Sequence, residues 1–413
     1  MTLPGTLVCT VGTSLFYPNM KMLDPEKSYQ GERPVSDPTA VADWDALEKA
    51  GLLRDPKDMP RRLREIKDAY ESSMYGRLAG LLVKLPPELR LCGAEINSIA
   101  AMVKKGFLPE NRQSLILLVS DTTEGSAIGE ILSRYFEASH CPIRFERCEI
   151  ETVSGLQDEQ PLLFQREGLP NLVRLLGKHY RKWGGTIAIN ATGGYKAQIA
   201  LAVAFGQAAG STVYYKHERF DQIIRFPQIP FTLDLSLVEE HKKLWADLAE
   251  PGASFDRQTI NTLLPPDENF REQVLPLLES IEEGPSSLYS LSALGMVYWE
   301  TFLSKHPDLT LRPSKVSARR GCRFRDDHYP IGFKEHVERF YKAFPDYVSE
   351  CHSMPYDGQA AIENTFYIYN KQIIGGYLDK NRFGARFAVM SSAENQLERQ
   401  WLVQEFNKWL QSR

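Results

Sequence analysis

The chain has 413 residues, of which 43% are hydrophobic and 25% charged, and its formal net charge is −4. This length exceeds what one ordinary core supports and predicts two or three domains. No apolar run reaches the ~20 residues of a membrane helix, and the first residues lack the basic and apolar segments of a signal peptide. We therefore expect a cytoplasmic protein without membrane contact. The scattered cysteines, none in a C-x-x-C pair, predict free thiols and no metal site.

The first half of the chain alternates between strand and helix patterns. Residues 6–11 are β-branched and bounded by glycine, as in a buried strand, whereas residues 17–112 predict a large, charge-rich helical excursion. Further strands are expected at 114–120, 143–150, 186–190, 212–215 and 222–226, and helices through Tyr135, near 161–182 and at 196–209. This alternation predicts an α/β, Rossmann-like domain over residues 1–235 with a mainly parallel, doubly wound sheet.

Two polar loops with glycines follow strands of this predicted sheet. Val11-Gly12-Thr13-Ser14 follows the first strand, and Asn190-Ala191-Thr192-Gly193-Gly194-Tyr195-Lys196 connects a later strand to a helix. Glycines let the backbone approach an anion closely, hydroxyl and N–H groups donate to it, and Lys196 adds a positive charge. Neither loop has the Walker A or the G-x-G-x-x-G spacing, which disfavours a P-loop enzyme and a dinucleotide dehydrogenase. Both loops fall at carboxyl ends of strands, so together they predict a site for a phosphate-bearing ligand.

These two loops resemble the motifs of CARF domains, the Rossmann-like sensors of type III CRISPR systems. The phrase at residues 92–99 and the strand end at 117–121 also resemble that family. The resemblance implies a homodimer that binds a cyclic oligoadenylate, with cyclic tetra-adenylate as the expected ring, across its two-fold axis. Some members also cleave their ligand slowly, but binding alone is the favoured interpretation here, with no further cofactor. By resemblance, the ligand-binding residues are Gly12, Thr13, Ser14, Asn190, Thr192, Gly193, Gly194 and Lys196.

Residues 236–311 predict a small helical connector. Their helical patterns are separated by Pro265-Pro266 and by Glu283-Gly284-Pro285, and residues 287–303 have the turn-then-helix pattern of a winged helix. The expected recognition stretch, residues 288–299, contains no Lys or Arg. Because contacts to phosphate dominate DNA affinity, we expect this stretch to form core and not to bind DNA.

Residues 312–413 predict a separate α+β domain. They contain a basic segment, an amphipathic helix at 332–343, strand patterns at 348–354, 362–369, 372–378 and 383–391, and a helix at 394–411. Residues 311–413 hold 16 basic and 12 acidic residues, whereas the remainder holds 33 and 41. A basic block on an acidic body points to a polyanionic partner at this end.

Two nuclease families are considered first for this domain. Arg323 and His328 match the R-x4-H spacing of HEPN ribonucleases, in which arginine and histidine from two protomers cleave RNA without a metal. A HEPN domain is a helical bundle, however, and four strand patterns follow this motif. A metal-dependent PD-(D/E)-x-K nuclease is disfavoured because no Glu-x-Lys or Asp-x-Lys occurs from residue 255 onward.

The order of helix, antiparallel strands and closing helix is similar to RelE-type toxins, which are ribosome-dependent mRNA endonucleases. The resemblance implies metal-free chemistry, with positive side chains holding the scissile phosphate and stabilising the transition state. Gly384 is expected to let a phosphate or base approach the backbone, and His328 is expected to act as acid or base or to cap a helix. The candidate catalytic residues are Arg323, Arg325, His328, Lys380, Arg382 and Arg386.

The sequence thus predicts a ribonuclease of CRISPR antiviral defence that cyclic oligoadenylate activates. Its expected partners are the cyclic ligand, mRNA on the ribosome and a second copy of the chain. Two alternatives remain open at this point: a HEPN-type ribonuclease, and a CARF sensor with a winged helix that regulates transcription without catalysis.

Overall fold

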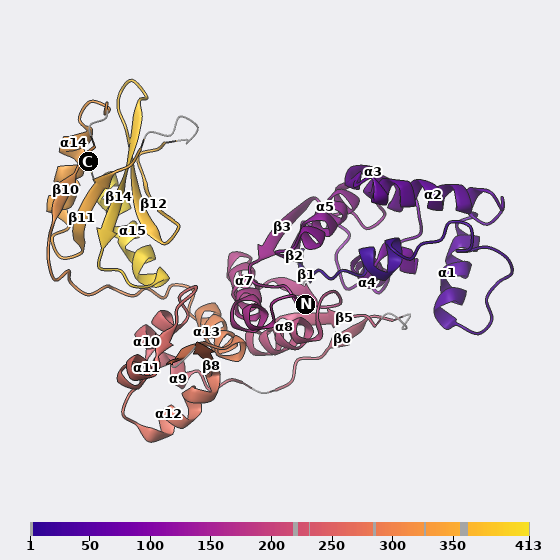
Figure 1. Ribbon diagram of the computed structural model, residues 1–413, viewed down its shortest axis with the longest axis horizontal. Helices are drawn as coiled ribbons and strands as arrows, with labels where there is room; N and C mark the ends of the chain where they lie inside the picture. Colours follow the sequence, from indigo (N-terminus) through magenta and orange to yellow (C-terminus); the bar gives the residue numbers. More distant parts are fainter. Residues whose placement is uncertain are drawn as a thin grey trace. The chain divides into compact units, whose positions relative to one another are not determined.

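The computed structural model describes residues 3–217, 222–230, 232–283, 286–325, 328–355 and 362–412 (Figure 1). The chain forms two compact units. The N-terminal unit comprises Met1–Glu239 and Phe255–Pro307, and the C-terminal unit comprises Glu240–Ser254 and Asp308–Arg413. Residues 236–311, expected to be one connector, are therefore divided between the two units.

The N-terminal unit is built on a six-stranded sheet of order β3-β2-β1-β4-β5-β6. All neighbouring strands pair in parallel except β5 and β6, which confirms the predicted mainly parallel sheet. The central strand is buried along its whole length, as expected for a strand covered on both faces. The strands are β1 (Thr6–Thr10), β2 (Ser114–Ser120), β3 (Arg147–Val153), β4 (Ile187–Asn190), β5 (Thr212–Tyr215) and β6 (Ile224–Phe226).

Strand β3 begins later than the expected range of 143–150. Ile143 and Phe145 are buried in the core, and the Phe145 N–H donates to the carbonyl of Phe136. These two apolar residues therefore pack against a helix end before the chain enters the sheet. Their hydrophobic character alone did not distinguish the two environments.

The predicted helical excursion between β1 and β2 is confirmed. Leu47, Leu63, Leu82 and Ile99 from four of its helices are buried in one core with residues of β1 and β2. The helices of the excursion are η1 (Leu15–Met20), α1 (Pro38–Lys49), α2 (Asp58–Glu71), α3 (Tyr75–Leu82), η2 (Arg90–Cys92) and α4 (Ala94–Lys104). The later helices are α5 (Thr123–Glu137), α6 (Pro161–Leu163), η3 (Phe164–Gly168), α7 (Leu169–Lys182) and α8 (Lys196–Ala209). In the part of the chain that the structure describes, no helix has both the length and the apolar character needed to cross a membrane.

A three-stranded antiparallel sheet of order β7-β9-β8 completes the N-terminal unit. The expected recognition stretch, 288–299, spans the end of β9 and the start of α13, so it does not form one helix. Helix α13 buries Met296, Trp299 and Phe302, which confirms that it forms core. Glu300 of this helix pairs with Arg181 of α7. The elements are α9 (Ser236–Glu239), β7 (Phe255–Asp256), α11 (Arg257–Leu263), α12 (Glu268–Val274), η4 (Leu275–Leu277), β8 (Leu278–Glu283), β9 (Ser286–Leu291) and α13 (Ala293–Lys305).

The C-terminal unit has a five-stranded sheet of order β10-β11-β14-β13-β12. Only β10 and β11 pair in parallel. The expected order of helix, four strands and closing helix is confirmed from α14 to α15, but the strand β10 precedes it in the expected basic segment. Helices α14 and α15 pack on one face of this sheet, where Phe340, Phe387 and Phe406 meet. The elements are α10 (Lys242–Leu248), β10 (Gly321–Arg323), α14 (Phe333–Ala343), β11 (Val348–Ser353), β12 (Phe366–Tyr369), β13 (Gln372–Leu378), β14 (Gly384–Ser391) and α15 (Gln396–Gln411).

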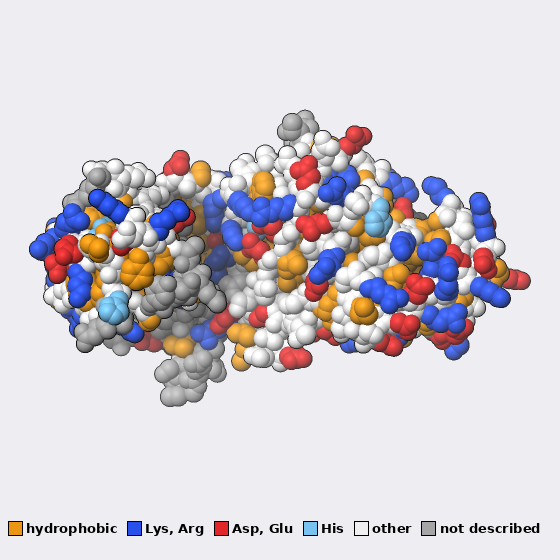
Figure 2. Space-filling view, turned by 90° about the horizontal axis from the view of Figure 1, so that it is seen from above, with side chains coloured by type: hydrophobic (Ala, Val, Ile, Leu, Met, Phe, Trp, Pro, Cys, Tyr) orange, Lys and Arg blue, Asp and Glu red, His pale blue; other side chains and the backbone are white. Residues whose placement is uncertain are grey.

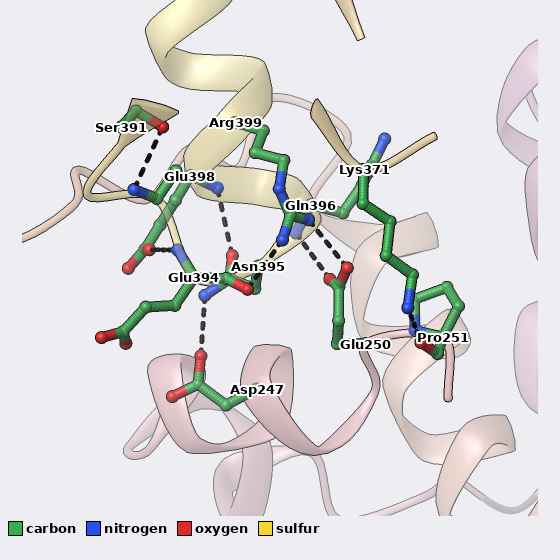
Figure 3. Close-up of polar contacts among 11 residues, drawn as sticks. Asp247, Glu250, Pro251, Lys371, Ser391, Glu394, Asn395, Gln396, Glu398 and Arg399 are labelled. Atoms are coloured by element: carbon green, nitrogen blue, oxygen red, sulfur yellow. Dashed lines mark hydrogen bonds and ion pairs between the residues drawn. The ribbon is translucent and has the colours of Figure 1, made fainter. Parts of the chain in front are cut away.

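Residues 240–254 contact the start of α15 through hydrogen bonds and an ion pair (Figure 3). Arg399 donates to the carboxylate of Glu250 at 2.7 Å, and Asn395 donates to Asp247 at 2.8 Å. Arg399 and Asn395 are both buried. This segment is thus an integral part of the C-terminal unit, although residues on both sides of it in the sequence belong to the N-terminal unit.

Candidate functional site

The two glycine-bearing loops of the N-terminal unit meet in one cavity. Strands β1 and β4 are neighbours, so the loops that follow them leave the same edge of the sheet. The cavity has a volume of about 550 Å³. Its lining includes seven of the eight predicted ligand-binding residues, namely Gly12, Thr13, Ser14, Thr192, Gly193, Gly194 and Lys196.

The loops approach so closely that two positions require glycine. A Cβ on Gly12 would lie 2.5 Å from the backbone nitrogen of Gly194. A Cβ on Gly193 would lie 2.0 Å from a carboxylate oxygen of Glu95 and 2.7 Å from the carbonyl oxygen of Thr10. The glycines are therefore needed for the packing of the loops on each other, in addition to the predicted approach of an anion.

Asn190, the eighth predicted residue, does not line the cavity. Its side chain is fully buried, donates to Ser98 Oγ at 2.8 Å and accepts a hydrogen bond from Thr192 Oγ1 at 2.7 Å. Thr192 Oγ1 in turn accepts a hydrogen bond from the backbone N–H of Lys216 at 3.0 Å. The expected contact between Asn190 and the ligand is therefore corrected. As the last residue of β4, Asn190 positions the loop through buried hydrogen bonds.

The cavity wall is basic. Arg90, Lys196 and Lys216 line it, and none of its described lining residues is Asp or Glu. The N-terminal residues of two helices, Ala94 of α4 and Lys196 of α8, also line it, and such helix ends attract anions. Ser14 Oγ accepts a hydrogen bond from the backbone N–H of Ala94 at 3.2 Å, so the first loop is held against the start of α4. This combination suits a ligand with several negative charges.

Elsewhere on the N-terminal unit the charges are mixed. In the space-filling view, basic and acidic side chains are interspersed over the end formed by α1 and α2, on the right (Figure 2). Ion pairs join Arg61 to Asp58 and Arg33 to Asp45 in this region. A lining that carries basic side chains and, among its described residues, no acidic one therefore distinguishes the cavity from this part of the surface.

Three tyrosines give the cavity flat apolar surfaces. Tyr17, Tyr195 and Tyr215 are part of the lining, and Tyr17 is 60% exposed. Burial and the neighbouring Asp158 raise the pKa of Tyr195 to about 12, so its hydroxyl is neutral at physiological pH. Aromatic rings of this kind can stack on nucleobases.

Two further cavities adjoin the first. One of about 540 Å³ shares Arg90 with it, and one of about 760 Å³ shares Asn97 and Lys216. The concave surface at this edge of the sheet is therefore larger than a single nucleotide requires.

A buried carboxylate lies behind the loops. Glu95 is fully buried, and its Oε1 accepts a hydrogen bond from the backbone N–H of Gly12 at 2.8 Å. Its Oε2 has no hydrogen-bond partner among the described residues, and burial raises the pKa of Glu95 to about 7. No sequence pattern predicted this role of Glu95, because an acidic residue in the first turn of a helix is ordinary. Arg90 and Lys216 were also missed, since each lies far in the sequence from both loops.

The predicted catalytic residues of the C-terminal unit occupy three places. Arg323 ends β10, with Arg325 and the exposed His328 following it, whereas Arg386 lies on β14. Lys380 and Arg382 are exposed in the turn between β13 and β14. The structure thus places these residues on one sheet, in the segment after β10 and in the β13–β14 turn.

Two details of these expectations change. Gly384 is buried and its Cα faces Ile362, since a Cβ there would lie 2.9 Å from the side chain of Ile362, so this glycine is not open to a phosphate. Gly332 is the N-cap of α14, so His328 does not cap that helix. Asp326 and Asp327, its expected neighbours, lie outside the described residues.

The HEPN alternative is not supported by the local structure. Arg323 is in a strand and His328 is in an irregular segment, whereas the HEPN motif requires a helix. No group of three His, Cys, Asp or Glu residues that could hold a metal occurs in the described parts of the chain.

Sequence reasoning missed a polar pair on β11. Glu350 is 4% exposed, and its Oε1 lies 3.0 Å from Nε2 of His352. Arg323 of the neighbouring strand β10 also forms an ion pair with Glu350. His352 and Arg323 together hold the pKa of Glu350 below its ordinary value. The alternation Glu-Cys-His in a predicted strand is a signal that could have revealed the pair, because period two places Glu350 and His352 on one face.

The segment that contains η2, α4 and the second loop matches a known protein family. Residues 90–229 match the model of a family described as CRISPR-associated protein (Cas_APE2256). The matched segment covers most of the cavity wall, including Arg90, Ala94, the 190–196 loop and Lys216. The N-terminal unit is therefore similar to a CRISPR-associated protein family, and this similarity supports a role in CRISPR defence.

Proposed function

We propose that this chain is an effector of CRISPR defence that binds a cyclic oligoadenylate in the cavity of its N-terminal unit and then cleaves RNA with its C-terminal unit. One observation carries the proposal. A basic cavity made by two glycine-bearing loops has no acidic side chain in its described lining, and most of that lining, with the second loop, lies in a segment similar to a CRISPR-associated family.

The composition of the cavity favours an oligonucleotide over a simple anion. Lys196 and the positive end of helix α4 at Ala94 favour phosphates, and Tyr17 and Tyr215 supply ring faces for bases. The adjoining cavities extend this surface. A cyclic oligoadenylate is itself symmetric, so it fits a site completed by a second copy of the chain around a two-fold axis. We expect cyclic tetra-adenylate to be the ring.

The chemistry proposed for the C-terminal unit is metal-free cleavage of mRNA, on the ribosome, as in RelE-type toxins. In this reaction the 2′-oxygen attacks the adjacent phosphorus and the 5′-oxygen leaves. Arginines such as Arg323 and Arg386, which lie on strands of one sheet, can stabilise the charge that develops on the phosphate. The basic balance of this part of the chain favours a polyanionic substrate.

The test is an RNA-cleavage assay with purified full-length protein. Cyclic tetra-adenylate is added or omitted, with and without ribosomes, in the presence and absence of EDTA. We expect cleavage only with the cyclic ligand and with ribosomes, unchanged by EDTA. Lys196→Ala should abolish activation, and Lys105→Ala, an exposed lysine at the C-cap of α4, should not. Full activation of the Lys196 variant would refute the assignment of the cavity.

The alternative of a DNA-binding regulator lacks structural support. Helix α13 buries Trp299 and Phe302 and packs against α7 through Glu300, so it does not offer an exposed recognition face. A gel-shift assay on upstream DNA provides the check. Salt-sensitive, sequence-specific binding without RNA cleavage in any condition would favour the regulator over the ribonuclease.

A further inference from the structure

The sheet of the C-terminal unit has one face that neither α14 nor α15 covers. Cys351, Phe387 and Val389 point into the core beneath these helices. Because side chains alternate along a strand, Glu350 and His352 of β11 extend from the opposite face. The same alternation places Arg323 of β10 there, since Cys322 and Phe324 on either side of it pack against the core.

Strand register brings these residues into neighbouring positions. Arg323 pairs with His352 across β10 and β11, and His352 pairs with Ala388 across β11 and β14. Ala388 contributes only a methyl group beside the imidazole. Arg386 lies two residues before Ala388 on the same strand and so on the same face. The imidazole of His352 therefore lies between two strands that each carry an arginine on this face, β10 with Arg323 and β14 with Arg386.

The carboxylate of Glu350 lies beside one nitrogen of this imidazole. Oε1 of Glu350 and Nε2 of His352 are 3.0 Å apart, and Glu350 is nearly buried while the His352 side chain remains 40% exposed. The contact is an ion pair of the protonated ring and not a hydrogen bond, since neither atom has a hydrogen-bond partner among the described residues. A buried carboxylate beside a partly exposed histidine stabilises the imidazolium that forms when the ring takes up a proton.

We propose that His352, positioned by Glu350, is the general base of the RNA cleavage carried out by the C-terminal unit. This assignment rests on the proposed ribonuclease function. The imidazole takes the proton of the 2′-hydroxyl as the bond from the 2′-oxygen to phosphorus forms. The bond from phosphorus to the 5′-oxygen breaks, the 5′-oxygen takes a proton from water, and the products are a 2′,3′-cyclic phosphate and a 5′-hydroxyl. The imidazolium then returns its proton to solvent.

Charged groups surround the imidazole. Glu350 lies on the same strand, Arg323 and Arg320 approach from the β10 side, and Arg386 lies on β14. A general base acts in its unprotonated form, so cleavage should rise with pH, and this rise should be lost without His352. In Glu350→Gln cleavage should slow, because the carboxylate no longer stabilises the imidazolium formed in the step.

The experiment compares activated wild type with His352→Ala, His352→Gln, Glu350→Gln and the exposed control His140→Ala. Rates are measured over a pH series, and imidazole is added to the alanine variant. We expect both His352 variants to lose about 10²–10⁴-fold in rate and the rising pH limb. Imidazole should restore part of the rate to His352→Ala, and His140→Ala should behave as wild type.

The outcomes separate this assignment from the proposed function. Wild type that cleaves no RNA in any condition refutes the ribonuclease proposal and, with it, the role of His352. Wild type that cleaves, beside folded His352 variants within threefold of its rate, overturns the His352 assignment alone. Variants that lose activity but keep the rising pH limb and show no imidazole rescue also overturn it. Folding is checked by thermal melting and by binding of cyclic tetra-adenylate to the N-terminal unit.

Discussion

The carboxylate of Glu95 accepts a hydrogen bond from the backbone N–H of Gly12 at 2.8 Å, in a position with no exposure to solvent. The same oxygen lies directly behind Gly193, so Glu95 touches both loops of the candidate ligand site. The residue that joins the two loops is therefore an ionisable one, buried in the first turn of α4.

Glu95 should make the stability of the protein depend on pH. Burial raises the pKa of Glu95 to about 7, above its value in an unfolded chain, so folding favours the protonated form. Its contribution to stability is fully present below the unfolded pKa and is lost as pH rises through about 7. The shift corresponds to about 3 kcal/mol. Glu95→Gln should lack this dependence. The difference in free energy of unfolding between Glu95→Gln and wild type should therefore shift in favour of the variant as pH rises from 5 to 8. Parallel curves for the two proteins in urea denaturation would contradict the burial of an ionisable Glu95.

Lys196→Ala should weaken ligand binding about 10–100-fold, because a charge-assisted hydrogen bond contributes roughly 1.5–3 kcal/mol. Isothermal titration calorimetry with cyclic tetra-adenylate measures the change. The loss should shrink as salt is raised, since salt screens an exposed charge. Lys105→Ala serves as the control and should bind as wild type does; equal losses in both variants would indicate only a general effect of net charge.

Gly193→Ala should remove ligand binding by displacing the loops. Its Cβ would meet Glu95 and the Thr10 carbonyl within 3 Å, so the backbone must shift. Gly80→Ala in α3 is the matched control, because no atom lies within 4 Å of the added methyl group. That change should stabilise the protein by about 0.5–1 kcal/mol, as alanine favours helix over glycine. Thermal melting and isothermal titration calorimetry of both variants test these two expectations. Normal ligand binding by Gly193→Ala would show that the loops tolerate separation.

Arg399→Met should loosen residues 240–254 from the C-terminal unit. Arg399 and Glu250 are almost buried, with 10% and 12% of their side chains exposed, so removing the cation leaves a desolvated carboxylate. Breaking such a pair costs roughly 3 kcal/mol. Hydrogen exchange should accelerate at the amides of α10. Lys408→Met removes an exposed pair with Glu405 and should change exchange little, because surface pairs contribute at most about 1 kcal/mol. Unaltered α10 exchange in Arg399→Met would mean that other contacts hold the segment.

The sequence alone identified most strands of the six-stranded sheet, four of the five strands of the C-terminal sheet, and the two loops of the cavity. Helix α8 and strand β5 begin and end at the expected residues. The reason is local: strand and helix periodicity, glycine at loops and the polar residues after strands are properties of short segments. Because the carboxyl ends of parallel strands share one edge of a sheet, the convergence of the Gly12 and Gly193 loops also followed from the pattern.

Only the tertiary structure decided which side chains support these features. Arg90 and Lys216 reach the cavity from distant segments, Asn190 turns into the core, and Glu95 lies behind the loops. In the C-terminal unit, the pairing of β10 with β11 joins Arg323 to Glu350. Such placements depend on packing between segments far apart in the sequence, and no local pattern encodes them. The sequence thus determined which loops follow the strands β1 and β4, whereas the folded chain determined which residues meet there.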